Sequence, residues 1–178
     1  MHSIIRLLTK PFRIVTHRLR TQGVKRTLMW LWGRGLPRLT GRLVLDHSQI
    51  TPQLYVGPQH GKIGKRQLEA AEINGCVNMR VEFDDAAYGL ELAEYCYLPT
   101  VDETPPALDD LRKGAAFMTR VIDAGGKVYV HCAGGVGRAP TMAAAYLITQ
   151  GMSLDDAIAL IQRGRPYVDV LPDQYARL

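Results

Sequence analysis

The sequence predicts a single α/β domain, with a central mixed sheet of about four or five strands and helices on its faces, preceded by a basic helical arm. Three observations lead to this prediction. The chain of 178 residues is long enough for one sizeable core but too short for two ordinary domains. Its composition, 47% hydrophobic and 22% charged, is that of a folded globular protein. From Val44 onward, short β-type runs alternate with helical patterns.

The first 42 residues differ in charge from the rest of the chain. They contain ten Lys and Arg and no Asp or Glu, whereas residues 43–178 contain twelve basic and 17 acidic side chains. A basic protein suggests nucleic acid as a partner, but here the positive charge belongs to one terminal segment and the remainder is acidic. We therefore expect a separate basic arm over residues 1–42, a domain over residues 43–178, and no nucleic acid partner.

The beginning of the arm has the pattern of an amphipathic helix. Apolar residues recur at spacings of three or four, and basic residues recur in the same way on the opposite side. The apolar set is Ile4, Leu8, Phe12, Val15 and Leu19. Pro11 should kink this helix or start a second one, and the segment from Gly33 to Gly41 is typical of a linker into the domain. Trp30 and Trp32 favour a membrane interface.

Three roles remain open for the arm. It could lie on an anionic membrane, serve as an organelle transit peptide, or pack on the domain with a solvated basic face. No apolar run approaches the roughly 20 residues needed to span a bilayer. The expected location is therefore the cytoplasmic side of a membrane, with peripheral attachment, and a mitochondrial location is the alternative.

The domain is expected to alternate strands with helices. The strands are 54–56, 76–79, 96–98 and 127–131, and the helices are 65–73, 108–124, 138–150 and 154–162. Ser153 is a suitable N-cap for the last of these helices. Cys76 and Cys96 lie within apolar strands and belong to the predicted core, whereas His60 is predicted to be an ordinary surface or turn residue. Three cysteines cannot form a disulfide framework, which favours a reducing compartment.

Residues 128–141 contain the most informative pattern in the chain. An apolar strand, Val128 to His131, runs into a turn with three glycines, and a helix is expected to begin near Arg138. The N–H groups of a loop that precedes a helix, together with the helix dipole, attract an anion. In that field the thiolate of Cys132 is favoured over the thiol, and the Arg138 guanidinium can hold two phosphoryl oxygens. These features predict a phosphate-transfer site.

This stretch resembles the signature His-Cys-x5-Arg of the cysteine-dependent protein tyrosine and dual-specificity phosphatases. The resemblance implies a protein-tyrosine-phosphatase-like fold in which Cys132 attacks phosphorus and Arg138 binds the phosphoryl oxygens. It also implies that His131 supports the loop and that the loop's backbone amides bind the substrate. The substrate-binding residues are then Ala133, Gly134, Gly135, Val136, Gly137 and Arg138. No metal or organic cofactor is implied.

The reaction also needs an acid, because the departing oxygen would otherwise leave as an alkoxide. In the family this acid is an aspartate on a separate loop upstream of the cysteine. Asp102 follows a predicted strand at such a position and is the predicted acid, with Glu103 as the alternative. A rhodanese-type sulfur carrier or an arsenate reductase also uses a cysteine in an anion loop, but neither explains Asp102 at this spacing.

One position departs from the family pattern. Ala139 stands where the family usually has a Ser or Thr, whose hydroxyl helps the thiolate to leave during hydrolysis of the phosphocysteine. We therefore expect either a slower second step or a substitute role for Thr141. The pair Ala139-Pro140 is also similar to plant-type glucan phosphatases.

Within the superfamily, residues 43–178 look most similar to the mitochondrial-type phosphatidylglycerophosphate phosphatases. The segments that carry this similarity are 100–102, 108–114, 128–132 and 144–148. That subgroup has Glu-Glu-Tyr near its site, where this chain has Val81-Glu82-Phe83. Glu82 is therefore carried over as a residue that shapes the site, and the missing first Glu predicts a difference in substrate recognition.

The predicted function is hydrolysis of a phosphomonoester through a phosphocysteine, with a membrane phospholipid such as phosphatidylglycerophosphate or a phosphoinositide as substrate. A protein tyrosine, dual-specificity or glucan phosphatase is one alternative, and a non-catalytic phosphate-binding module is another. The expected partners are the phosphorylated lipid and, through residues 1–42, an anionic membrane surface; the sequence does not indicate an oligomeric state. Arg165, close to Pro166, either solvates a helix end or borders the mouth of the site.

Overall fold

The computed structural model describes residues 2–45 and 48–178, with side chains from Val15 onward except His17. The helices are α1 (His2–Thr40), α2 (Lys62–Ala70), α3 (Leu108–Asp123), α4 (Arg138–Thr149), α5 (Leu154–Gly164) and α6 (Pro172–Arg177), with a short 3₁₀ helix η1 (Ala86–Tyr88). The strands are β1 (Leu54–Gly57), β2 (Gly75–Arg80), β3 (Glu94–Thr100) and β4 (Val128–His131). Ser153 caps α5 as predicted, because its hydroxyl accepts the N–H of Asp156.

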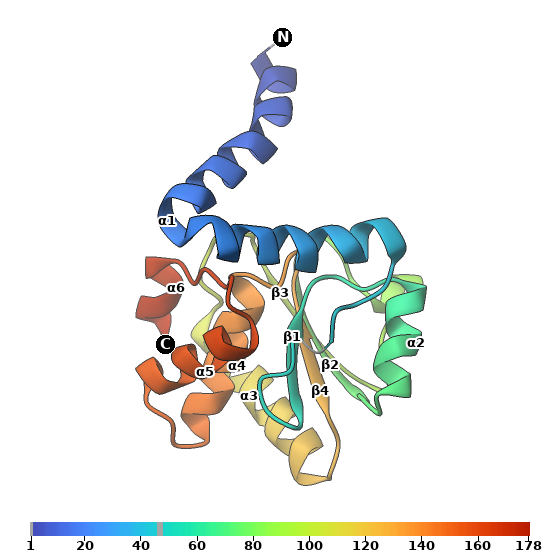
Figure 1. The fold of residues 1–178 in the computed structure, drawn as a ribbon. Coiled ribbons are helices and arrows are strands. Elements are labelled where there is room, and N and C mark those ends of the chain that lie inside the picture. The colour runs from blue at the N-terminus through green and yellow to red at the C-terminus, as the bar shows by residue number, and fades with distance from the viewer. Residues whose placement is uncertain (1, 46–47) are drawn as a thin grey trace.

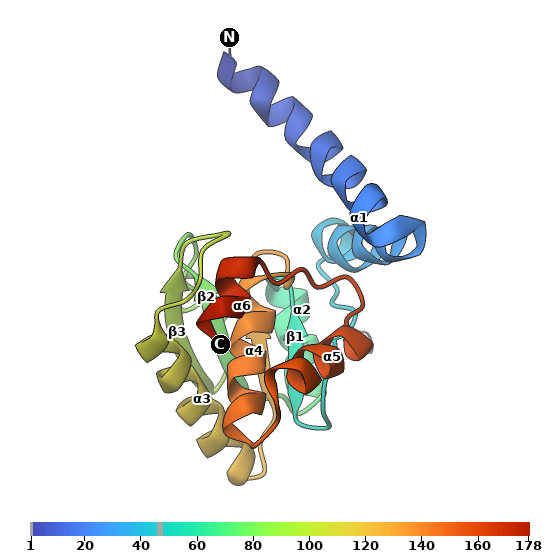
Figure 2. The same ribbon diagram turned by 90° about the vertical axis from the view of Figure 1, so that its left-hand side faces the viewer.

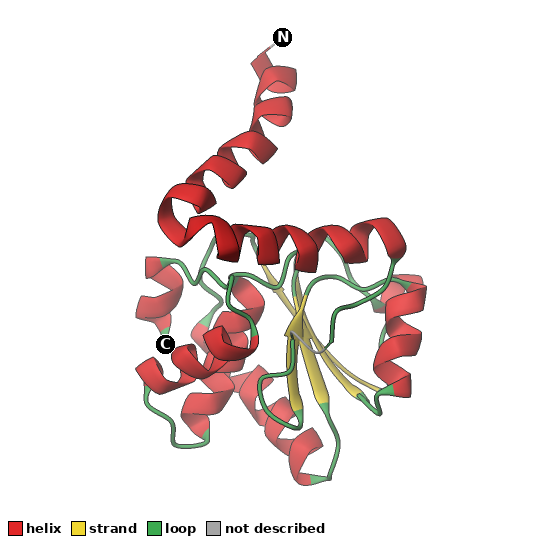
Figure 3. Cartoon of the chain, in the orientation of Figure 1, coloured by secondary structure: helices red, strands yellow, loops and turns green. Residues whose placement is uncertain are grey.

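The four strands form one sheet in the order β1-β4-β2-β3, and every neighbouring pair is parallel (Figure 3). The α/β class and the number of strands are confirmed, but the sheet is parallel rather than mixed. In the part of the chain that the structure describes, the only antiparallel pairing is an isolated bridge between Gln49 and Tyr55. Each connection carries the chain back to the end of the sheet at which the previous strand began. The next strand therefore runs in the same direction. The carboxyl ends of all four strands therefore lie together.

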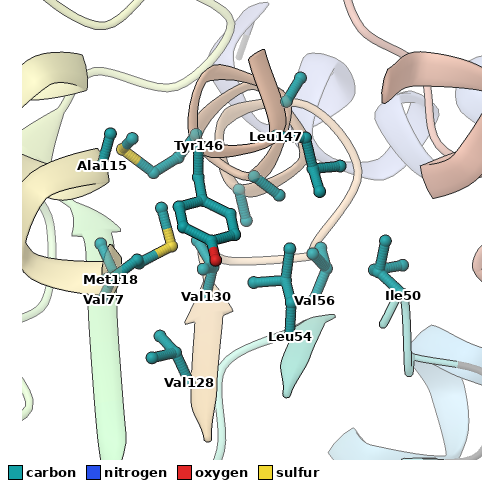
Figure 4. Packing of buried hydrophobic residues seen from close by; sticks show 14 of the residues in the cluster. Ile50, Leu54, Val56, Val77, Ala115, Met118, Val128, Val130, Tyr146 and Leu147 are labelled. Carbon is teal, nitrogen blue, oxygen red and sulfur yellow. The ribbon is translucent and has the colours of Figure 1, made fainter. Parts of the chain in front are cut away.

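Apolar clusters lie on both faces of the sheet. On one face, α3, α4 and α5 pack over a cluster that includes Leu54 and Val130 (Figure 4). Cys96 belongs to the same cluster. On the other face, α2 contributes Leu68 to a smaller cluster with Cys76 and Tyr129, which point to the opposite side because side chains alternate along a strand. Both cysteines are buried, as the apolar strands predicted. The sheet is thereby fixed from both sides, and the ends of its strands make a firm base for a site.

Helix α1 bends at Gly23, which adopts a φ of 78°. A residue in the left-handed region interrupts a helix. Pro11 lies within the helical stretch before Gly23, and the kink expected there stays a prediction. Before the bend the helix points away from the domain, and after the bend it lies across the edge where the strands end (Figures 1 and 2). The predicted apolar stripe from Ile4 to Phe12 lies outside the described side chains.

The segment from Gly33 to Thr40 is helical, so the predicted linker is wrong. Gly33 is buried against Tyr167, and an added Cβ at this position would overlap the Tyr167 hydroxyl. Glycine disfavours a helix by only about 1 kcal/mol, which close packing of this kind can outweigh. The chain leaves the helix at Gly41, where φ is 69°.

Candidate active site

Cys132 follows β4 directly and begins a loop that ends at the start of α4. The N–H of Gly135 donates to the Cys132 sulfur at 3.2 Å. Gly135 has a φ of 62°, and an added Cβ would overlap the Gly57 carbonyl and come within 2.7 Å of Arg165 Nη2. The loop can curl around the sulfur because residue 135 is glycine.

The carbonyl groups from Ala133 to Gly137 each accept a hydrogen bond from another part of the chain. The pairs are Ala133 O with Gln59 N, Gly134 O and Gly135 O with the Arg165 side chain, Val136 O with Asp169 N, and Gly137 O with Thr141 N. Within the described residues, no backbone acceptor is recorded for the N–H groups of Ala133, Gly134, Val136, Gly137 or Arg138. A ring of N–H groups at a helix N-terminus binds an anion. An anion such as a phosphoryl group could therefore bind in this loop, beside the sulfur.

Arg165 fixes this arrangement, and sequence reasoning missed its role. Its side chain is buried, its Nε donates to Gly135 O at 2.6 Å, and its Nη2 donates to Gly134 O at 3.0 Å. Its Nη1 donates to Ser48 Oγ at 3.1 Å, and its guanidinium stacks on Tyr167. The two roles predicted for Arg165 are wrong. Arg165 follows the end of α5, and its side chain enters the interior, so it neither solvates the helix end nor borders the mouth of the site. The local sequence carries no sign of a partner 30 residues away.

Arg138 begins α4 and is almost completely buried. Its Nη1 and Nη2 donate to the two carboxylate oxygens of Glu82 at 3.0 and 2.9 Å. Nη1 also donates to the carbonyls of Thr100 at 2.7 Å and Met79 at 3.3 Å. The Nε atom is buried and has no hydrogen-bond partner among the described residues. The guanidinium is thus held on one side by protein oxygens, with Nε left for a ligand.

Glu82, predicted to shape the site, is the main partner of Arg138. The hydrogen bond from Arg138 lowers the pKa of Glu82 to about 2, and Arg80 adds a further ion pair at 3.2 Å. Burial lowers the pKa of Arg138, but Glu82, Cys132 and Asp102 together raise it above its ordinary value. The charged form of the arginine is therefore favoured where a phosphate would bind.

Asp102 reaches the same guanidinium from the loop after β3. Its Oδ1 lies 3.0 Å from Arg138 Nη2, and its side chain is 67% exposed. The structure therefore brings the predicted acid to the predicted phosphate-binding arginine. Glu103 is exposed, has a φ of 63°, and has no recorded ion pair with another described residue. Of the two candidate acids, Asp102 is the one whose carboxylate contacts the site.

His131, predicted to support the loop, belongs to a buried polar cluster next to Cys132. Its Nε2 lies 2.7 Å from Asp85 Oδ2, and both side chains are inaccessible to water. Burial raises the pKa of Asp85, but the hydrogen bond from His131 and the charge of that residue lower it below its ordinary value. This pair fixes the imidazole immediately before the nucleophile candidate.

His60 completes the cluster and corrects a prediction. It is buried, not a surface or turn residue, because its Nε2 bonds to Leu90 O at 2.8 Å inside the protein. Burial and the neighbouring His131 lower the pKa of His60 to about 4. The ligand atoms of His60, Asp85 and His131 lie within 4.8 Å of one another, close enough to hold a metal ion, but Asp85 and His131 are already paired.

Ala139 and Thr141 lie in the first turn of α4. Ala139 is completely buried, so the position after the arginine offers no hydroxyl. The Thr141 hydroxyl donates to Gly137 O at 2.9 Å, within the same turn. Thr141 therefore supports the end of the loop, and its predicted help to the leaving thiolate stays a prediction.

A cysteine at the end of a central parallel strand, an anion-binding loop and an arginine at the start of the next helix define a cysteine-dependent phosphatase. The chain belongs to the dual specificity phosphatase family, whose catalytic-domain model matches residues 54–177. The resemblance found in the sequence is thus confirmed.

Two human proteins illustrate the relationship. Phosphatidylglycerophosphatase and protein-tyrosine phosphatase 1 is 33% identical over 159 residues, which cover 83% of this chain and 78% of that protein. Dual specificity protein phosphatase 1 is 27% identical over 122 residues, which cover 67% of this chain but only 33% of that protein.

Solved structures agree with these sequence matches. A crystal structure of PTPMT1 in complex with PI(5)P has a TM-score of 0.66 and 29% identity, and the match covers 72% of this chain and 89% of that one. Human DUSP28, at 23% identity and a TM-score of 0.65, shares the fold.

Proposed function

We propose that this phosphatase hydrolyses phosphomonoesters through a phosphocysteine formed on Cys132. The observation that carries the proposal is that every carbonyl from Ala133 to Gly137 accepts a hydrogen bond from elsewhere in the protein. The N–H groups of the loop are then available to bind a phosphoryl group. The Gly135 N–H and the start of α4 stabilise negative charge on the sulfur. Arg138 adds a charge-assisted hydrogen bond through its Nε.

In the first step, the Cys132 sulfur attacks phosphorus opposite the leaving oxygen. The S–P bond forms as the P–O bond breaks, and the proton of Asp102 passes to the departing oxygen. The contact of Asp102 with Arg138 supports this role, because the same arginine holds the phosphoryl oxygens. Glu82 positions that arginine and does not contact the reacting atoms.

In the second step, water attacks the phosphocysteine. The new O–P bond forms as the S–P bond breaks, the sulfur leaves as a thiolate, and the Asp102 carboxylate takes a proton from the water. Ala139 supplies no hydroxyl to the leaving thiolate, so we expect this step to be the slower of the two.

The proposed substrate is an anionic membrane phospholipid, such as phosphatidylglycerophosphate or a phosphoinositide. The names of the relatives support this class, since one is a phosphatidylglycerophosphatase and one was solved with PI(5)P. The surface of α1 supports it independently. The second half of α1 and Tyr167 border an apolar groove of about 640 Å³, whose lining includes Leu28, Leu31, Trp32, Leu36, Leu39 and Tyr167.

The proposal includes peripheral attachment to an anionic bilayer through residues 1–42, with residues 43–178 as the catalytic domain. Leu28, Trp32 and Leu39 are exposed on α1, and the exposed Lys25 and Arg26 lie on the same half of the helix. Apolar and basic groups together bind an anionic interface. Among the described helices, none combines the length and apolar character needed to cross a membrane.

The test is a comparison of specificity constants. Phosphatidylglycerophosphate, a phosphoinositide, a phosphotyrosine peptide and a phosphorylated glucan are supplied at equal concentrations, the lipids in vesicles of identical composition. We expect the lipids to have the highest kcat/KM. A preference for the phosphotyrosine peptide would instead assign the chain to protein substrates, a role that also appears in the name of the human relative. Binding without turnover of any substrate would leave only a phosphate-binding module.

A further inference from the structure

The second half of α1 places an arginine at the rim of the catalytic loop. Arg34 Nη1 lies 3.5 Å, and its Cζ 3.6 Å, from the position that a Cβ on Gly134 would occupy. Arg34 is partly buried, and its Nε has no hydrogen-bond partner among the described residues. A guanidinium from outside the matched catalytic domain therefore faces the loop that holds Cys132.

Among the described residues, the contact that positions Arg34 is its packing on Trp30. Trp30, one turn earlier in α1, is buried, and the Arg34 Cζ lies 5.5 Å from its ring centre. Arg18 stacks on the same ring at 4.9 Å and donates to Tyr167 O at 3.1 Å, which ties the helix to the domain. Cation–π contacts of this kind set the direction of a guanidinium while leaving its N–H groups available.

Charged groups of both signs lie near Arg34. Burial and the nearby Arg38 lower the pKa of Arg34, whereas Asp102 and Cys132 act to raise it. Arg34 is therefore close enough to Asp102 and Cys132 for their charges to affect its pKa. Such a guanidinium, partly desolvated and with no ion pair to a carboxylate among the described residues, favours a bound anion.

We propose that Arg34 binds a second phosphate group of the substrate, next to the phosphomonoester that the catalytic loop holds. The loop N–H groups and Arg138 Nε already serve the reacting phosphate, and Arg34 lies outside that ring at Gly134. The substrate class is a molecule with two phosphates joined by a short linker, as in a phospholipid whose headgroup carries a terminal phosphate. This inference deepens the proposed function and rests on it.

The test uses water-soluble headgroup mimics, so that neither membranes nor acyl chains contribute. Glycerol 1,3-bisphosphate and glycerol 3-phosphate are hydrolysed by the full-length wild type, R34Q, R34K and the control R38Q. Arg38 lies one turn further along α1, is exposed, and matches the charge change. We expect R34Q to lower kcat/KM about 10- to 100-fold for the bisphosphate and less than about 3-fold for the monophosphate. R34K should retain part of the preference, and R38Q should behave as the wild type.

Three results would overturn the inference. They are equal kcat/KM values of the wild type for the two mimics, equal losses on both mimics in R34Q, and a loss in R38Q as large as in R34Q. Thermal unfolding of each variant separates local from global effects. The proposed lipid function is judged separately, by wild-type turnover of lipid vesicles. A preference for the bisphosphate that depends on Arg34 stands even where the vesicle lipid is not hydrolysed.

Discussion

The catalytic loop and the second half of α1 meet near Cys132, but they are held in different ways. Every carbonyl of the loop from Ala133 to Gly137 is hydrogen-bonded. Arg138, at the end of the loop, and Arg165, which binds two of its carbonyls, are each 1% exposed. Helix α1 is held by the stacked Trp30 and a few polar contacts, while Trp32 is 59% exposed and Leu39 is 88% exposed.

This difference separates two tasks. A loop fixed by buried hydrogen bonds is preorganised for charge that develops on a phosphoryl group, and it treats all phosphomonoesters alike. In the proposed function, α1 selects which substrates reach the loop, through its exposed apolar surface and Arg34. Changes in the loop should therefore affect every substrate, and changes in α1 should affect only some.

The largest effect should come from the nucleophile. Cys132→Ser should abolish turnover of soluble and lipid substrates alike, because a hydroxyl replaces the thiolate, while tungstate still binds to the intact loop. Steady-state kinetics and calorimetry measure the two quantities, with Cys96→Ala as a control in β3. Activity close to that of the wild type would refute the covalent mechanism.

The effect of removing the predicted acid, Asp102, should depend on the leaving group of the substrate. Asp102→Asn should lower kcat about 10²- to 10⁴-fold on alkyl phosphates and much less on an activated aryl phosphate, which leaves without a proton. Glu103→Gln is the matched control, since this neighbouring carboxylate has no recorded contact with Arg138. If Glu103→Gln causes the selective loss instead, the proton comes from Glu103.

Removal of α1 tests the other side of the comparison. Deletion of residues 1–40 should reduce turnover of vesicle lipid on the order of 10-fold or more, because each Lys or Arg near an anionic surface contributes about 1 kcal/mol. Hydrolysis of a soluble aryl phosphate should fall by less than about 3-fold, since the loop keeps its own hydrogen bonds. Co-sedimentation with vesicles at low and high salt measures the binding directly, and binding should weaken as salt rises. An equal fall in both activities would show that α1 supports the fold.

The smallest effect should be on stability, at Glu82. Its folded-state pKa of about 2 lies below the ordinary 4.5, so its ionised form stabilises the folded protein above about pH 4.5. That contribution is lost as the pH falls from 4.5 toward 2. Glu82→Gln should therefore be less stable than the wild type at pH 7 by a modest amount, since the side chain is 38% exposed and screened by water. Urea unfolding from pH 7 to 3 should show the two stabilities converging; a difference independent of pH would contradict this origin.

The loop could be predicted because its residues are neighbours in the chain. Cys132, the glycines and Arg138 follow one another, so the anion site is visible in the sequence as a strand, a turn and a helix start. Asp102 and Glu82 were identified by chemical need and by resemblance, and both contact Arg138.

Residues that act across the fold could not be predicted. Arg165 and Arg34 approach the loop from other elements, and an arginine carries no local sign of the carbonyl or anion that it will meet. The same holds for α1, where glycines typical of a linker are helical because Gly33 packs against Tyr167. The parallel direction of the strands was also not predicted, because it depends on how the connections cross the sheet.

The strand order has a consequence for how the protein folds. β1 and β2 both border β4, yet β4 is the last strand in the chain, so the sheet has a gap at its centre until residues 128–131 are synthesised. Contacts between distant segments make folding slow, and incomplete domains expose apolar surface during synthesis. Cys132 emerges directly after the strand that closes this gap, and Arg165 emerges later still. The loop around the Cys132 thiol can thus be completed only after β4, α4 and Arg165 have all been synthesised.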